Sequence, residues 1–90
     1  MSKQLDFAVQ FAHTCTRYGF APADLAELIR LSDRAFKAGE RYCNTGVERS
    51  NKPFKAVATK AKDMGMETNW PGLYPSFTNN IGQPVYLPQA

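Results

Sequence analysis

The strongest constraint on the fold is a helical pattern that runs without a break over residues 22–44. It begins at Pro22, and proline suits the first position of a helix because its missing N–H would have no intrahelical partner there. No second proline interrupts the pattern, and Gly46 follows it as a natural terminator. Such a helix measures about 33 Å. It crosses the whole of a small domain, so the rest of the chain has to pack along it.

This long helix carries two contrasting faces. Four basic residues, which we call the basic stripe, are spaced four, three and four positions apart: Arg30, Arg34, Lys37 and Arg41. Residues at this spacing share one side of a helix. The opposite side is apolar or small and carries Leu28, Ala35, Phe36, Gly39, Tyr42 and Cys43. The pattern therefore predicts one buried side and one strongly basic side in solvent.

Charge is distributed unevenly along the ninety residues. Residues 30–62 hold nine basic and three acidic residues, a net charge of +6, whereas the remainder holds two basic and five acidic residues, a net charge of −3. A domain does not need this asymmetry to fold, so it indicates an anionic partner. The alternative is an ordinary solvated helix surface, since lysine and arginine are good helix formers. Such a surface should interleave acids with the bases, but only Glu27 approaches the stripe.

Two shorter helices flank the long one. The first is expected from Ser2 or Lys3 to Tyr18 and has a wide apolar surface. The third follows a polar linker and is capped by Ser50 or Asn51. Its apolar residues recur at helical spacing, at Phe54, Val57, Ala58, Ala61 and Met64. The core is predicted to bury Leu28, Phe36, Phe54 and Val57.

The composition changes after Gly65. Residues 66–88 contain four prolines and one charged residue, and short strands are expected at 66–70, 74–78 and 85–87. Proline cannot donate to a sheet, so the prolines belong at strand edges and ends. We predict a single α+β domain over residues 1–90, helical over 3–65 and β over 66–88. Its long central helix two lies in a helical hairpin, expected to be formed with helix one by a turn near Gly19–Pro22, and a small C-terminal antiparallel β-hairpin or meander follows.

Catalysis and metal binding find no support in the sequence. His13, Cys15 and Cys43 fall short of the three or four clustered ligands that a metal site needs. The acidic residues of the long helix are explained by pairing with neighbouring lysines and arginines, and no glycine-rich phosphate loop is present. A helix-turn-helix is disfavoured because the long helix continues past Leu31 without the turn that precedes a recognition helix. We expect a protein that is not an enzyme, with no cofactor and no metal.

Neither a signal peptide nor a membrane span is expected. No apolar run approaches the roughly 20 residues that cross a bilayer, and polar side chains interrupt the apolar pattern at the N-terminus. The expected location is the cytoplasm, with no membrane partner.

Aromatic residues are the second set of candidate contacts. Those after Gly65 can cover the helices, although Trp70 and Tyr74 flank a Pro-Gly turn, where one of them can stay exposed as a contact anchor. Phe7, Phe11 and Tyr18 of the first helix are either core or interface residues. In the second case, helix one forms a homodimer.

Two stretches resemble small accessory proteins of bacteriophages and prophages. The first is the run 34–41 followed by Cys43 and Asn44, and the second joins Gly65 to the tryptophan-proline-glycine turn of residues 69–75. The resemblance covers most of residues 20–88. It implies a protein that blocks a host machine stoichiometrically. Anti-CRISPR proteins are similar in size and in lacking catalytic residues.

Three hypotheses follow. The first is a non-enzymatic phage-type inhibitor that binds a host defence nucleoprotein, anti-CRISPR-like, in the bacterial cytoplasm. Its partner-binding residues are Arg30, Arg34, Lys37, Arg41, Lys52, Lys55, Trp70 and Tyr74, which meet RNA or DNA phosphates or an acidic protein surface. The second is a DNA- or RNA-binding accessory or regulatory protein that uses the same face. The third is a structural or dimerising phage protein.

Overall fold

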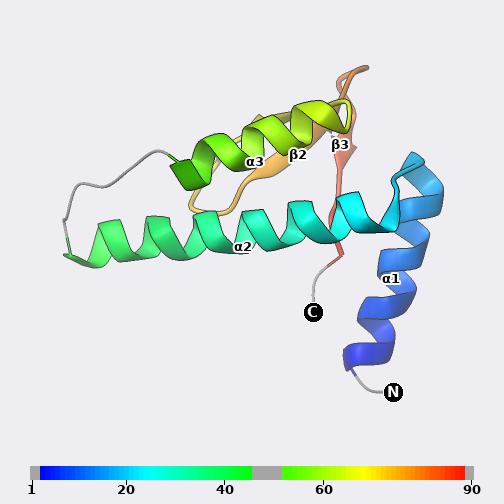
Figure 1. Cartoon of the computed structure of the whole chain (residues 1–90), viewed down its shortest axis with the longest axis horizontal. Coiled ribbons are helices and arrows are strands. Elements are labelled where there is room, and N and C mark those ends of the chain that lie inside the picture. Colours follow the sequence, from blue (N-terminus) through cyan, green and yellow to red (C-terminus); the bar gives the residue numbers. More distant parts are fainter. Residues whose placement is uncertain (1–2, 46–51, 89–90) are drawn as a thin grey trace.

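The computed structural model describes residues 3–45 and 52–88 (Figure 1). Its elements, in chain order, are α1 (Lys3–Tyr18), α2 (Pro22–Thr45), α3 (Lys52–Asp63), β1 (Met66–Asn69), β2 (Ser76–Asn79) and β3 (Pro84–Val85). The predicted α+β fold is confirmed, as three helices followed by a small antiparallel sheet. The predicted cap at Ser50 or Asn51 and the terminator Gly46 lie outside the described residues.

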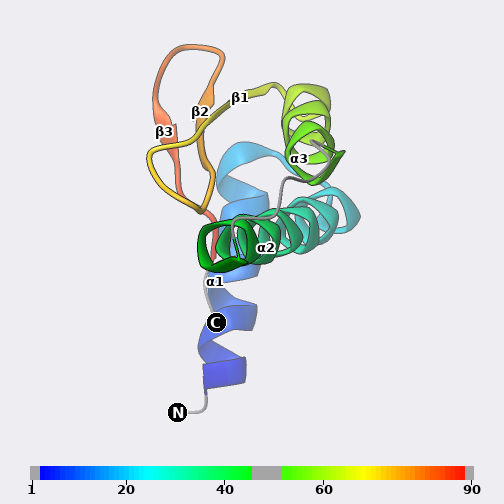
Figure 2. The same cartoon turned by 90° about the vertical axis from the view of Figure 1, so that its left-hand side faces the viewer.

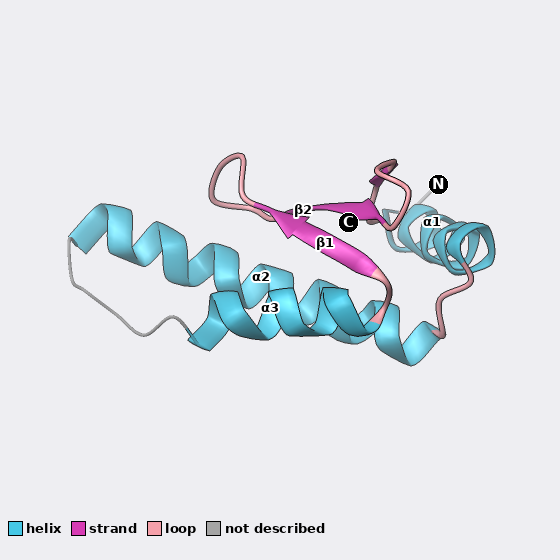
Figure 3. Ribbon diagram, turned by 90° about the horizontal axis from the view of Figure 1, so that it is seen from above, coloured by secondary structure: helices cyan, strands magenta, loops and turns pink. Residues whose placement is uncertain are grey.

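Helices α2 and α3 form a helical hairpin, lying antiparallel along most of α3 (Figures 1 and 3). Completely buried side chains recur every three or four residues on both helices: Leu25, Leu28, Ser32 and Ala35 of α2, and Val57 and Ala61 of α3. Leu28, Ala35, Val57 and Ala61 belong to one core cluster. Ser32 is the polar residue among those on α2, and its hydroxyl donates to the carbonyl of Leu28 at 2.8 Å. The polar side chain on the buried face of α2 therefore has a hydrogen-bond partner, as buried polar groups require.

The sheet has the order β1-β2-β3 with both pairings antiparallel. Each strand contributes one side chain to the core that it forms with α2 and α3: Met66 from β1, Phe77 from β2 and Val85 from β3. Gly65 makes the turn from α3 into β1 with φ 81°, a left-handed conformation that other residues rarely adopt. The sheet therefore covers one flank of the hairpin and leaves the underside of α2 uncovered (Figure 2).

All three strands are found, but only the start of the first, at Met66, lies where it was predicted. The second strand begins at Ser76 rather than at Tyr74, since Pro75 has no N–H with which to start a ladder. The third strand ends at Val85, and the chain beyond it leaves the sheet. Pro84 sits on the edge strand opposite Thr78, where a missing donor is tolerated.

Helix α1 does not pack along α2, so the hairpin expected for the first two helices is not formed, and α2 pairs with α3 instead. Helix α1 leaves the end of α2 crosswise and projects on the side away from α3 (Figures 1 and 2). Its C-terminal residue Tyr18 stacks on Phe20 with ring centroids 5.6 Å apart, and both rings pack against the core. Further along α1, Phe7 and Phe11 contact one another at 6.1 Å and are half-buried, while Val9 is 49% exposed.

The core prediction was right for two residues and wrong for two. Leu28 and Val57 are fully buried, but Phe36 and Phe54 are only half-buried. Both phenylalanines lie at the edge of the helical hairpin, where each meets an aromatic residue of the β1–β2 loop: Phe36 meets Tyr74 at 5.9 Å, and Phe54 meets Trp70 at 5.4 Å.

Candidate functional site

The basic stripe lies on the free face of α2. Arg30, Arg34, Lys37 and Arg41 are all exposed, and the buried residues Leu28 and Ala35 lie on the opposite side of the helix. The stripe spans about 16 Å along the helix axis.

The residues of the basic stripe differ in whether an acidic residue pairs with them. Arg30 donates from Nε and Nη2 to the two carboxylate oxygens of Glu27, at 3.1 and 2.5 Å. This hydrogen bonding lowers the pKa of Glu27 and raises the pKa of Arg30, so the pair is charged on both sides at neutral pH. Among the described residues, Arg34 and Lys37 have no hydrogen-bond or ion-pair partner. The middle of the stripe is therefore its uncompensated part.

Lys52 and Lys55 are exposed on α3 and line an open groove between α3 and α2. The groove has a volume of about 530 Å³, and it also takes in Glu27 and Leu31 from α2. Lys60, at the same groove, donates to Asp24 at 2.8 Å, a hydrogen bond that raises the pKa of the lysine. Basic and acidic side chains therefore line the same groove. Its lysines belong to α3, whereas the basic stripe belongs to α2.

The β1–β2 loop places Trp70 against Phe54 of α3 and Tyr74 against Phe36 of α2. Trp70 is 39% exposed and meets Phe54 edge-on. Tyr74 is half-buried and its hydroxyl donates to Asp33 at 3.4 Å. Burial, followed by the charge of Asp33, raises the pKa of Tyr74. Tyr74 is thus a packing residue, and Trp70 is the exposed member of the pair.

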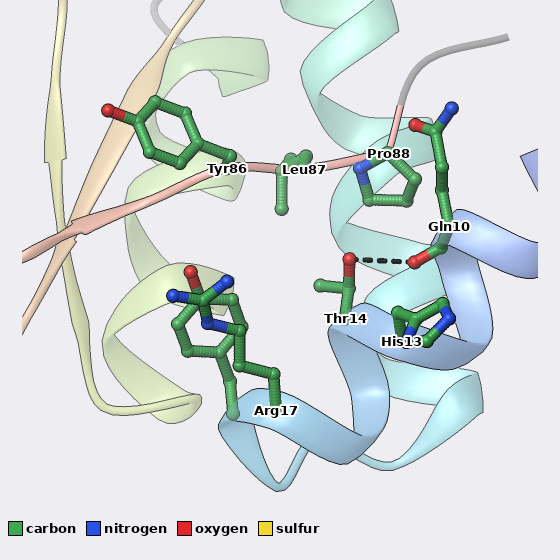
Figure 4. Close-up of a pocket in the computed structure, with 8 residues that line it drawn as sticks. Gln10, His13, Thr14, Arg17, Tyr86, Leu87 and Pro88 are labelled. Carbon is green, nitrogen blue, oxygen red and sulfur yellow. Dashed lines mark hydrogen bonds between the residues drawn. The ribbon is translucent and has the colours of Figure 1, made fainter.

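A hollow that the sequence did not reveal lies between α1 and the C-terminal segment (Figure 4). It has a volume of about 250 Å³. Helix α1 contributes His13, Thr14 and Arg17, and the segment after β3 contributes Tyr86 and Leu87. The two walls are about seventy positions apart in the sequence, so no local pattern could bring them together.

Within residues 3–45 and 52–88, histidine, cysteine, aspartate and glutamate form no group of three that could hold a metal ion. None of the helices in these ranges is long and apolar enough to cross a membrane. No protein family, curated protein or solved structure matches the chain.

Proposed function

We propose that the chain is a small non-enzymatic binding protein that docks onto nucleic-acid phosphates in a nucleoprotein complex through the basic stripe. The observation that carries the proposal is the middle of the stripe. Arg34 and Lys37 are exposed and unpartnered among the described residues, on the free face of the longest helix. Uncompensated charge in a row on a rigid element attracts an anionic partner.

The spacing of the stripe suits a phosphate backbone. Phosphates repeat about every 3.4 Å along one strand of B-form DNA, so a stripe of about 16 Å runs beside roughly five of them. The arginines add a planar fork of donors that matches phosphate oxygens. An ordinary solvated helix face would pair its cations three or four residues apart with acids. Arg30 is paired in this way, but Arg34 and Lys37 are not.

The resemblance to phage accessory proteins supplies the biological context. In that context the nucleoprotein is a host defence complex, and the protein is an anti-CRISPR-like inhibitor that occupies a surface near its guide RNA. Direct binding to free DNA or RNA is the second candidate, since it uses the same face and the same charges. A dimerising role through α1 is supported by the exposure of Val9.

The test compares Arg34→Gln and Lys37→Gln, singly and together, with the control Lys62→Gln. Lys62 is exposed on α3 outside the groove and has no partner among the described residues, so the control removes a matched charge elsewhere. The immobilised protein is offered bacterial host lysate with and without nuclease, and labelled single-stranded RNA is titrated separately. We expect the double variant to lose nuclease-sensitive capture and the control to keep it. Equal capture of nucleoprotein and equal RNA binding by all variants would refute the proposal.

The same experiment ranks the candidate functions. Capture of a nucleoprotein without measurable affinity for free RNA supports the inhibitor. Comparable affinity for free RNA supports the direct nucleic-acid binder. Self-association that persists in high salt, with no capture and no RNA binding, supports the dimer, because apolar association is not screened by salt.

A further inference from the structure

Tyr86 is an exposed aromatic residue on a fixed piece of backbone. Its ring is 74% exposed. The residue before it, Val85, is 5% exposed in the core, and Pro88 two positions later is also buried. The backbone is therefore held on both sides of a side chain that stands in solvent. A partner that binds such an aromatic ring gains a large contact area, and little conformational entropy is lost because the ring is already held in place.

Across the hollow, α1 presents a second flat surface. The guanidinium carbon of Arg17 lies over the ring of Tyr18, 5.7 Å from its centroid. Tyr18 is itself stacked on Phe20 and packed against the core. Figure 4 shows Tyr86 across the hollow from Arg17. The hollow thus lies between an aromatic ring and a guanidinium group that rests on another ring.

The charge of the hollow selects the kind of ligand. No aspartate or glutamate lines it, whereas the cationic Arg17 does, and the imidazole of His13 lies beside it in the same wall. The α2–α3 groove differs in this respect, since Glu27 and Asp63 line it. Thr14 donates its hydroxyl to the carbonyl of Gln10 at 2.9 Å, so that donor is already used. A planar group that carries negative charge fits these walls best.

We infer that the hollow receives one unpaired nucleotide of the partner nucleic acid. The base stacks between Tyr86 and Arg17, and the phosphate faces the cationic wall of α1. Unpaired bases are commonly bound in this way, on aromatic rings and arginine planes. The inference rests on the proposed function and deepens it, because it specifies a single-stranded partner.

The position of the hollow is compatible with one continuous strand. It lies at the end of α2 from which α1 departs, and the stripe begins at Arg30, about 12 Å further along that helix from Pro22. A single strand of roughly a dozen nucleotides is within the range that small single-strand-binding domains cover. Such a strand can place phosphates on the stripe and one base in the hollow.

The test uses fluorescence anisotropy with a labelled oligothymidine of about twelve nucleotides and a duplex of equal length. The variants are Tyr86→Ala and the conservative Tyr86→Phe. The control is Ile81→Ala, since Ile81 is 71% exposed at the β2–β3 turn and does not line the hollow. We expect Tyr86→Ala to weaken single-strand binding roughly tenfold, the loss typical of one stacked base, with an unchanged salt dependence. Tyr86→Phe and the control should bind like wild type, and duplex binding should not change.

The outcomes separate this inference from the proposed function. If wild type shows salt-dependent binding but Tyr86→Ala matches it, the stripe hypothesis survives and the nucleotide site is refuted. If wild type binds neither probe, the nucleotide site is refuted, whereas docking onto an assembled nucleoprotein is decided by the capture of nucleoprotein from lysate. A second measurement follows the Tyr86 ring by NMR during titration with thymidine monophosphate or inorganic phosphate. We expect ring shifts with the nucleotide alone; equal shifts with phosphate would mean a simple anion site and would overturn the inference.

Discussion

The packing of α2 against α3 leads to a prediction about two leucines of very different burial. Leu28 is fully buried in the core, whereas Leu73 in the β1–β2 loop is 40% exposed. Leu28→Ala removes the transfer free energy of the buried side chain and leaves a cavity, because the two helices cannot close over it completely. The expected cost is about 3–4 kcal/mol. Leu73→Ala makes the same chemical change where solvent fills the space, and its expected cost is about 1 kcal/mol.

These costs are large for a domain of this size, whose total stability is expected to be about 5–10 kcal/mol. At roughly 4–8 °C per kcal/mol, Leu28→Ala should lower the melting temperature by about 12–32 °C. Urea unfolding followed by circular dichroism gives both free energies, and an unchanged denaturant slope shows that the same surface unfolds. Equal losses for the two variants, or a loss below about 1 kcal/mol at Leu28, would refute the packing of this hairpin.

Two further predictions concern aromatic residues. Phe36→Ala should cost about 2 kcal/mol, clearly less than Leu28→Ala, because the ring of Phe36 is only half-buried; a loss equal to that of Leu28→Ala in the same urea experiment would contradict this. The raised pKa of Tyr74 favours its neutral form in the folded state, so the group's contribution to stability is complete below the ordinary tyrosine pKa of about 10 and is lost as the pH rises through the folded value. Tyr74→Phe should remove this part of the loss of stability at alkaline pH. Asp33→Asn should reduce the loss without abolishing it, since burial is the larger cause of the raised pKa. An ultraviolet titration in which Tyr74 ionises at the ordinary pKa would show the reasoning to be wrong.

Local patterns predicted the helices well because the relevant physics is local. The proline at position 22 and the glycine at position 19 delimit α2 and α1 through backbone geometry alone, and the structure has both boundaries where the sequence indicated them. The four-three-four spacing placed the whole basic stripe on one exposed face. The pairing of Arg30 with Glu27 was also visible in their separation of three residues.

Features that depend on distant segments were harder to predict. Phe36 lies on the apolar side of α2, but the residues that meet it are determined by the β1–β2 loop, nearly forty positions later. Helical periodicity predicts which side of the helix a side chain lies on, but it does not predict how deeply that side chain is buried. The crosswise direction of α1 and the hollow beside Tyr86 likewise arise from contacts between the two ends of the chain.

The same helix carries the core and the candidate interface on opposite sides, so stability and binding can be changed separately. Substitutions at the exposed stripe are expected to alter the free energy of unfolding by no more than about 0.5 kcal/mol each. The loss of binding in such a variant can then be assigned to the lost charges, provided that its circular dichroism and melting temperature match wild type.

The most direct measurement of the central claim is the salt dependence of single-stranded RNA binding by wild type and by the variant with glutamine at Arg30, Arg34, Lys37 and Arg41. Each phosphate contact on a single strand contributes about 0.7 to the slope of log affinity against log salt. If the stripe binds phosphates, the variant should bind orders of magnitude more weakly and its slope should fall by up to about 3. A folded variant with the slope and affinity of wild type would show that the basic stripe is an ordinary solvated surface.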